Sequence, residues 1–184
     1  MMSSAFNGGA LYVYSESSSL NIVNSSFDNI SGYANGSVIY STAPVNISGS
    51  NFTNIEGPFY EGTVANNYAA VYVASDLNID NSRFINITGP RAASVYLANP
   101  DSTLNISHSV FANNLALNTA VWSEAIYNNI NYCIFANNTG WEGNYWDFIA
   151  TGPYLVKSNL NYNYWESNEG PYYNFNYDNA ILDN

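Results

Sequence analysis

One short pattern is written five times along this 184-residue chain, and it constrains the fold more than any other feature of the sequence. Each copy carries Asn-Ile, a Phe five residues after the Ile, and a further Asn two residues after the Phe. The phenylalanines of the five copies are Phe27, Phe52, Phe84, Phe111 and Phe135. Their spacing of 24 to 32 residues is typical of solenoid repeats, in which each unit buries its apolar face only against its neighbours.

Each repeat contains short strands rather than helices. Around the Leu-Asn-Ile segment apolar and polar residues alternate with a period of two, which is typical of a strand with one buried face. A second strand precedes it in each unit, beginning at residues such as Gly9, Gly36 and Thr119. The sequence therefore predicts an all-β parallel β-helix, or solenoid, of about five to six coils, with asparagine ladders at its corners.

Composition excludes several classes of function. The formal net charge is −11 and the only cations are Arg83, Arg91 and Lys157, so we expect no nucleic-acid partner and no docking on an anionic membrane. A single cysteine, Cys133, allows neither an intrachain disulfide nor an all-cysteine metal site. No apolar run approaches the roughly 18 residues of a membrane span, so no membrane insertion of this segment is expected.

Several stretches resemble known cell-surface proteins. The segments FDNISGYANGSVIY and FINITGPRAASVYL resemble the tandem motifs of chlamydial polymorphic outer-membrane proteins, with the Asn one position closer to the Phe. The repeats, together with GGALYVY at 8–14 and NYWESNEGP at 163–171, are more closely similar to the adhesin-like surface proteins of methanogenic archaea. The second of these stretches departs from the closing motif of that family at Tyr164 and Glu166.

That resemblance implies a right-handed parallel β-helix with an extracellular, cell-surface location and a role in adhesion. The partners it implies are cell-surface or fibre glycans, or a surface protein of another cell. The first residues lack the basic and apolar regions of a signal peptide, so we expect the chain to be an excerpt of a larger exported protein. The resemblance names no ligand-binding residue, and candidates come from the pattern itself.

One aromatic column is the best candidate for a binding site. Aligning the first strand of each repeat places the following residues in one column: Tyr12, Ile39, Tyr72, Tyr96 and Trp122. Alternation turns this column outward, where aromatic rings offer faces on which sugars stack. Glycan binding through Tyr12, Tyr72, Tyr96 and Trp122 is therefore predicted. Two other interpretations stay open: loops cover the column as ordinary packing, or the column faces inward.

The columns predict neither an enzyme nor a cofactor. Asp28 and Asp80 have no carboxylate neighbour in their columns, whereas glycoside hydrolysis needs two carboxylates about 5–9.5 Å apart. Asp80 and Arg83 are interpreted as a surface pair. His108, the only histidine, fits a polar corner position, and Cys133 fits a buried small column. Structural Ca²⁺ among the Asn and Asp turns has no supporting motif. A polysaccharide lyase or glycoside hydrolase on the β-helix, and a purely structural spacer, are the alternatives.

The chain is predicted to form one domain with two parts. Residues 1–162 form the coils, and residues 163–184 form an aromatic-rich segment that caps the open end. Such a cap is needed because the last coil of a solenoid exposes apolar residues and unpaired strand edges. Trp141, Trp146, Trp165 and Tyr177 belong to the aromatic C-terminal region, and a second carbohydrate platform is the alternative to a cap.

Overall fold

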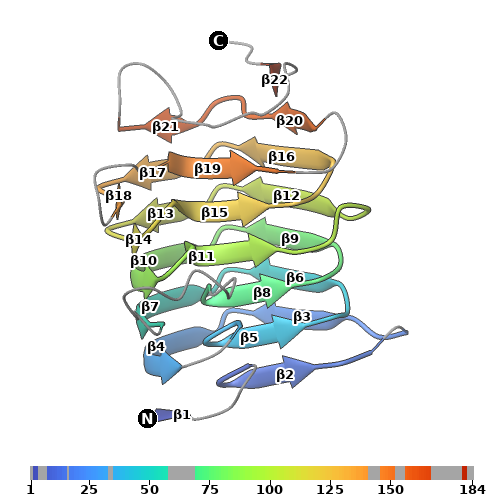
Figure 1. Cartoon of the computed structure of the whole chain (residues 1–184), viewed down its shortest axis with the longest axis vertical. Coiled ribbons are helices and arrows are strands. Elements are labelled where there is room, and N and C mark those ends of the chain that lie inside the picture. Colours follow the sequence, from blue (N-terminus) through green and yellow to red (C-terminus); the bar gives the residue numbers. More distant parts are fainter. Residues whose placement is uncertain are drawn as a thin grey trace.

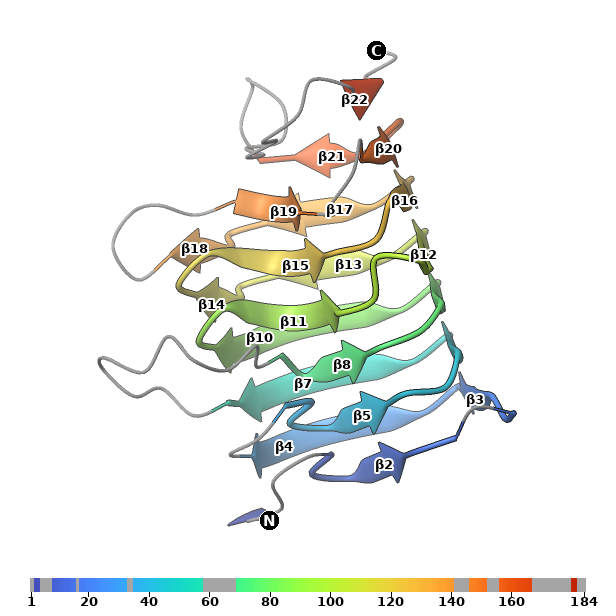
Figure 2. The same cartoon turned by 45° about the vertical axis from the view of Figure 1, so that its right-hand side comes forward.

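The computed structural model describes residues 2–3, 8–15, 17–32, 35–57, 69–140, 146–151, 156–166 and 180–181. Within these residues the chain forms strands and no helix, and the strands belong to three sheets (Figure 1). Successive coils add a strand to each sheet in turn, so the sheets form the walls of a solenoid (Figure 2). The predicted right-handed parallel β-helix of about five to six coils is confirmed.

We name the sheets after a residue that recurs in each. The tyrosine sheet contains, in spatial order, β19 (Trp146–Ala150), β15 (Thr119–Ser123), β11 (Ala92–Leu97), β8 (Val71–Val73), β5 (Ile39–Ser41) and β2 (Leu11–Val13). The asparagine sheet contains β22 (Ala180–Ile181), β20 (Lys157–Asn159), β16 (Tyr127–Asn131), β12 (Thr103–Ser107), β9 (Leu77–Asp80), β6 (Val45–Ser48) and β3 (Leu20–Val23). The phenylalanine sheet contains β1 (Met2–Ser3), β4 (Ser26–Gly32), β7 (Asn51–Glu56), β10 (Arg83–Gly89), β13 (Val110–Ala112), β17 (Ile134–Ala136) and β21 (Tyr164–Trp165), with β14 (Leu115–Ala116) and β18 (Thr139–Gly140) beside them.

Equivalent residues of successive coils lie opposite each other in these parallel sheets, as the repeat predicts. The asparagine sheet aligns Ile22, Ile47, Ile79, Ile106 and Ile130. The phenylalanine sheet aligns Phe27, Phe52, Phe84, Phe111 and Phe135. The phenylalanine rings stack inside the solenoid with centroids 4.7 to 5.0 Å apart, and Trp165 continues this inner ladder 4.5 Å from Phe135. The stack buries apolar surface that no single coil could bury alone.

Two columns of residues have left-handed backbone, one at a corner of the coil and one along the phenylalanine sheet, where it lies inside β4, β7 and β10. The first column lies between the asparagine and phenylalanine sheets, with φ from 47° to 59° at Asn24, Gly49, Asn81, His108, Tyr132 and Tyr162. The second lies two residues after each phenylalanine, with φ from 51° to 57° at Asn29, Asn54, Asn86, Asn113 and Asn137. Asparagine adopts this conformation more readily than most residues because its short side chain can hydrogen-bond locally.

Side-chain amides form a ladder along the outer face of the asparagine sheet. Each amide donates to the amide oxygen of the preceding coil over 2.8 to 2.9 Å, in the order Asn129, Asn105, Asn78, Asn46 and Asn21. Ladders are expected at the corners, but a short ladder in which Asn86 donates to Asn54 over 2.6 Å lies inside strands β10 and β7. The longer ladder lies on a flat strand surface instead, because its residues alternate with the buried Leu, Val and Ile of the same strands.

Coil-like strand pairing extends past the predicted boundary at residue 162. β21 pairs in parallel with β17, with Tyr164 opposite Ile134 and Trp165 opposite Phe135. Farther along, β22 pairs in parallel with β20. Most of 163–184 lies outside the described residues, so the capping role of this segment stays a prediction.

Candidate functional site

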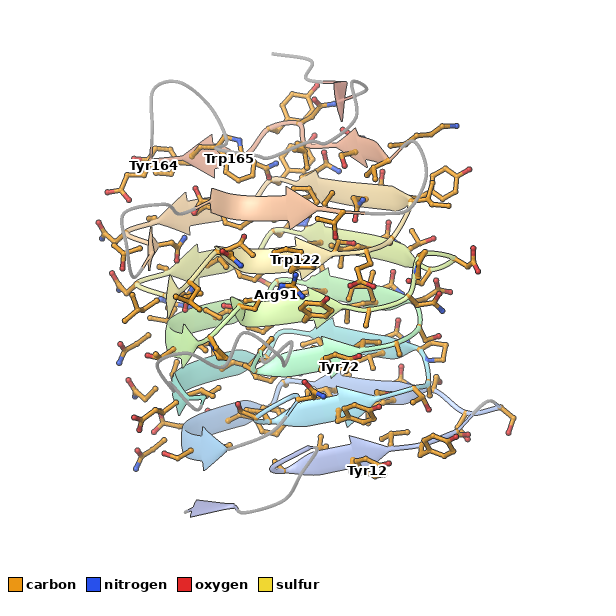
Figure 3. The ribbon with its side chains drawn as sticks, viewed as in Figure 1. Tyr12, Tyr72, Arg91, Trp122, Tyr164 and Trp165 are labelled. Carbon is orange, nitrogen blue, oxygen red and sulfur yellow. The ribbon has the colours of Figure 1, made fainter. Side chains whose placement is uncertain are left out.

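An aromatic ladder runs up the outside of the tyrosine sheet (Figure 3). We call it the tyrosine ladder; its members, in register, are Tyr12, Tyr40, Tyr72, Tyr96 and Trp122. Successive ring centroids lie 5.2, 5.1, 5.5 and 6.0 Å apart, and neighbouring rings are parallel to within 9°. The structure therefore brings together all four residues predicted to bind a glycan, and their side chains point away from the main core.

The predicted column is wrong at one position, in the second coil. Tyr40, not Ile39, lies opposite Tyr12 and Tyr72, and Ile39 points into the core. The cause is the choice of anchor: Gly8 and Gly36 are the equivalent glycines, with φ of 64° and 65°, and each lies four residues before its tyrosine, whereas the predicted alignment started from Gly9 and Gly36. A shift of one residue in the alignment exchanges inward and outward positions, so it placed the inward Ile39 in the outward column.

The ladder is exposed at one end and buried at the other. Tyr12 exposes 55% of its surface, and Tyr40 and Tyr72 are half-buried. Tyr96 is fully buried and Trp122 exposes only 8%, where both pack with Ala69 and Ala92 in a small apolar cluster outside the main core. The predicted ridge is thus accessible only over the first three coils. In the later coils the column is covered by packing, as the alternative interpretation expects.

Polar groups close the buried end of the tyrosine ladder. The Tyr96 hydroxyl donates to Glu124 over 2.5 Å, and burial together with this bond raises the pKa of Tyr96 far above its usual value. The Trp122 indole N–H donates to the Thr151 hydroxyl over 3.1 Å. The Arg91 guanidinium lies over the Trp122 ring, 4.2 Å from its centroid (Figure 3). These contacts hold the Tyr96 and Trp122 side chains in place and satisfy their polar atoms, so both residues serve packing.

Stacking limits how the exposed tyrosines can meet a ligand. Parallel rings at these centroid distances are offset-stacked, so each ring covers part of its neighbour's face. A sugar cannot lie flat over every ring in turn. It can contact ring edges, the phenol hydroxyls and the uncovered part of a face, and hydroxyls both donate and accept hydrogen bonds.

The other residues singled out in the sequence have structural contacts. Asp80 accepts a hydrogen bond from the Ser107 hydroxyl at 2.7 Å and lies 3.0 Å from the His108 ring nitrogen; these bonds lower the pKa of Asp80. Asp80 is therefore paired with the next coil and not with Arg83. Cys133 is buried in the small column, its thiol donates to the Asn131 carbonyl, and burial raises its pKa to about 11. A thiol that is neutral at pH 7 is a poor nucleophile.

Within the described residues, carboxylates do not gather into a metal site. No group of three or more His, Cys, Asp or Glu side chains that could hold a metal occurs in the part of the chain that the structure describes. Asp28 accepts hydrogen bonds from Thr53 and Asn54, which lower its pKa. Asp147 differs, because burial raises its pKa to about 6, and the charge of Glu166 adds to the effect. Sequence reasoning missed Asp147, since the sixth coil has no Phe-anchored copy of the pattern.

No protein-family model matches this chain, and no match was found among curated proteins or solved structures. Among the described residues there is no helix with the length and hydropathy of a membrane span. The geometry of the aromatic ladder is accordingly the main structural support for a functional hypothesis.

Proposed function

We propose that this chain is a non-enzymatic β-helical segment of an extracellular adhesin-like protein, and that it serves as a stiff stalk or display surface that contacts glycans through exposed aromatic side chains. The observation that carries the proposal is the exposed part of the tyrosine ladder. Tyr12, Tyr40 and Tyr72 stand in a straight row outside the core, with centroids 5.1 and 5.2 Å apart. A fold does not need such a row on a half-exposed surface, whereas a neutral polymer of hydroxyl-bearing rings fits it.

The stalk role follows from how the coils are joined. The inner ladder and the amide ladder both run through at least five coils without a break in register. Bending the solenoid would open these contacts on one side, so the body resists bending and holds surface residues at fixed spacings.

Native affinity electrophoresis tests the glycan contact. The protein is run through gels that carry embedded neutral or acidic polysaccharides, and the gels are stained afterwards for intact polymer. Retardation of the wild type by at least one neutral polysaccharide is expected. The triple variant Tyr12→Ala, Tyr40→Ala, Tyr72→Ala should lose part of that retardation, with unchanged β-sheet circular dichroism. Tyr127→Ala is the matched control, because Tyr127 is 50% exposed on a different sheet.

An enzyme is the second candidate, and Asp147 is the observation in its favour. A carboxyl with a pKa near 6, close enough to Glu166 to feel its charge, has the protonation behaviour of a general acid. Both groups also have structural partners, since Asp147 accepts from Asn138 over 2.9 Å and Glu166 accepts from the Asn137 N–H. Clearing of the polysaccharide around the band, lost in Asp147→Asn, would favour this candidate over the adhesin-like segment.

A purely structural spacer is the third candidate. The burial of Tyr96 and Trp122 favours it, because two of the five residues of the tyrosine ladder are used for packing. Unretarded migration of the wild type in every gel would favour the spacer, or a protein partner, over glycan contact.

A further inference from the structure

Two neighbouring surface columns change character together at the fourth coil. In the first left-handed corner column, Asn24, Gly49 and Asn81 of the early coils give way to His108, Tyr132 and Tyr162. In the outward column that opens the strands of the phenylalanine sheet, Ser26, Asn51 and Arg83 give way to Val110, Ile134 and Tyr164. We call the residues of both columns in the fourth to sixth coils the corner patch; they are His108, Tyr132, Tyr162, Val110, Ile134 and Tyr164.

The corner patch is exposed and ordered by stacking. The rings of His108 and Tyr132 lie 5.3 Å apart and those of Tyr132 and Tyr162 lie 4.9 Å apart, parallel to within 8°. Apart from the half-buried Val110, its members expose 44% to 69% of their surface. Asp80 holds the base of the stack through the His108 ring nitrogen, 3.0 Å away. The patch is therefore a preformed ridge of rings beside a row of apolar side chains.

The backbone shows that the fold itself does not require these rings. Tyr132 and Tyr162 have φ of 57° and 58°, a conformation that strains a bulky residue and suits asparagine or glycine. Asparagine occupies the second left-handed column in all five coils that it spans. Aromatic side chains in strained, exposed positions, three coils in succession, point to a surface role rather than to a need of the corner.

Size and charge select the class of ligand. The six side chains offer roughly 600 Å² of accessible surface if each aromatic ring contributes a little over half of its usual area. A stable protein interface needs about 800 Å² on each partner, so the patch alone is too small for one. Two copies of a chain with net charge −11 repel each other, and the same charge repels a polyanion. The tyrosine rings offer apolar edges and neutral hydroxyls, which match a neutral carbohydrate.

We infer that the corner patch binds a neutral glycan chain along the solenoid axis, as a second glycan contact separate from the tyrosine ladder. This inference rests on the proposed function, and it locates the contact in the fourth to sixth coils. Sugar C–H faces lie against Tyr132, Ile134 and Tyr162, while the phenol hydroxyls exchange hydrogen bonds with sugar hydroxyls.

His108 provides a built-in probe of the site. It is the only histidine in the sequence, so its imidazole protons give a unique pair of signals in a proton NMR spectrum. The full chain is titrated with cellohexaose, xylohexaose and mannohexaose, each a neutral oligosaccharide. At least one of them is expected to shift the His108 signals saturably, because a sugar beside the stack alters the ring environment.

The double variant Tyr132→Asn, Tyr162→Asn tests the patch. It introduces asparagine, which this column already contains at Asn24 and Asn81. It should fold normally and bind the active oligosaccharide at least tenfold more weakly, while Tyr127→Asn binds like the wild type. Equal binding by the double variant would overturn the inference.

The remaining outcomes separate the inference from the proposed function. Wild-type retardation in polysaccharide gels with motionless His108 signals would overturn the corner patch and leave the tyrosine ladder as the contact. Neither retardation nor a His108 shift would overturn both. Signals that move with protein concentration alone would place a second copy on the patch and contradict the glycan site.

Discussion

The first three coils and the last three coils share one inner ladder but differ in three other columns. Three residues after the phenylalanine, the early coils place Ile55 and Ile87 in the core, whereas the fourth coil buries the amide of Asn114 and the fifth has the half-buried amide of Asn138. At the first corner the early coils have asparagine and glycine, and the later coils have aromatic rings. The tyrosine ladder is exposed or half-buried in the early coils and buried in the later ones.

This difference separates what every coil needs from what each coil adapts. The stack of phenylalanines is common to both halves, because stacking against the next coil is the only way in which a coil buries its apolar face. The other columns respond to their own surroundings. The later coils carry more polar packing inside and more apolar surface outside, which is the reverse of a typical domain and marks them as the more specialised half.

The largest expected effect lies in the column that the halves share. Phe52→Ala and Phe111→Ala should each lower the free energy of unfolding by about 3–5 kcal/mol, because both rings are fully buried between two stacked neighbours. Urea unfolding followed by circular dichroism measures the loss. A difference of more than about 2 kcal/mol between the two variants would break the equivalence of the halves in this column.

The same contrast explains how much the sequence could predict. Stacking in register follows from the repeat, so the fold, the inner ladder and the outward direction of Tyr12, Tyr72, Tyr96 and Trp122 could be predicted. The place of Tyr40 could not, because Gly8 and Gly9 both precede the first strand and the sequence does not show that Gly8 is the left-handed residue equivalent to Gly36.

Burial and strain were also beyond the sequence pattern. Whether Tyr96 and Trp122 are covered depends on contacts outside the repeat, and their column alone gives only a direction. The strain at Tyr132 can be recognised only from its φ angle. Aligning His108 with asparagines of the same column does not supply that angle.

The second prediction concerns Asp147, which has no counterpart in the early coils. Its pKa is raised to about 6 in the folded protein, mainly by burial, against 3.8 for an ordinary aspartate. Between these two values the folded protein holds a proton that the unfolded chain has released. The free energy of unfolding should therefore fall as pH rises through this window, by roughly 2 to 3 kcal/mol, and stay level above it.

Replacing the carboxyl isolates this contribution from other groups. Asp28 and Asp80, whose pKa values are lowered, act in the opposite direction and stabilise the folded protein as pH rises toward their ordinary value of 3.8. The difference between the wild type and Asp147→Asn, measured by urea unfolding at pH 4.5 and 7, removes them from the comparison. A difference that does not change between the two pH values would contradict a raised pKa at Asp147.

The third prediction converts the polar interior of the fourth coil to that of the third. Asn114 accepts the buried N–H of Ile87 over 3.0 Å and donates to the Phe84 carbonyl over 3.1 Å. Asn114→Ile should lower the free energy of unfolding by about 2 kcal/mol, because both backbone groups lose their partner away from water. Asn105→Thr, in the exposed amide ladder, serves as the control with a smaller loss. A gain in stability from Asn114→Ile would mean that isoleucine suits this position in every coil.

The smallest expected effect belongs to the corner. Tyr132→Asn gives the fifth coil the residue found at Asn24 and Asn81, and it relieves a left-handed tyrosine that costs about 1–2 kcal/mol. It also removes ring stacking on His108 and Tyr162, which contributes about 0.5–1.5 kcal/mol. The two terms nearly cancel, so thermal unfolding should detect a change below about 1 kcal/mol. A loss above 2 kcal/mol would make Tyr132 a structural residue and remove the reason to assign it a ligand; a negligible change leaves a strained, exposed ring that stability does not require.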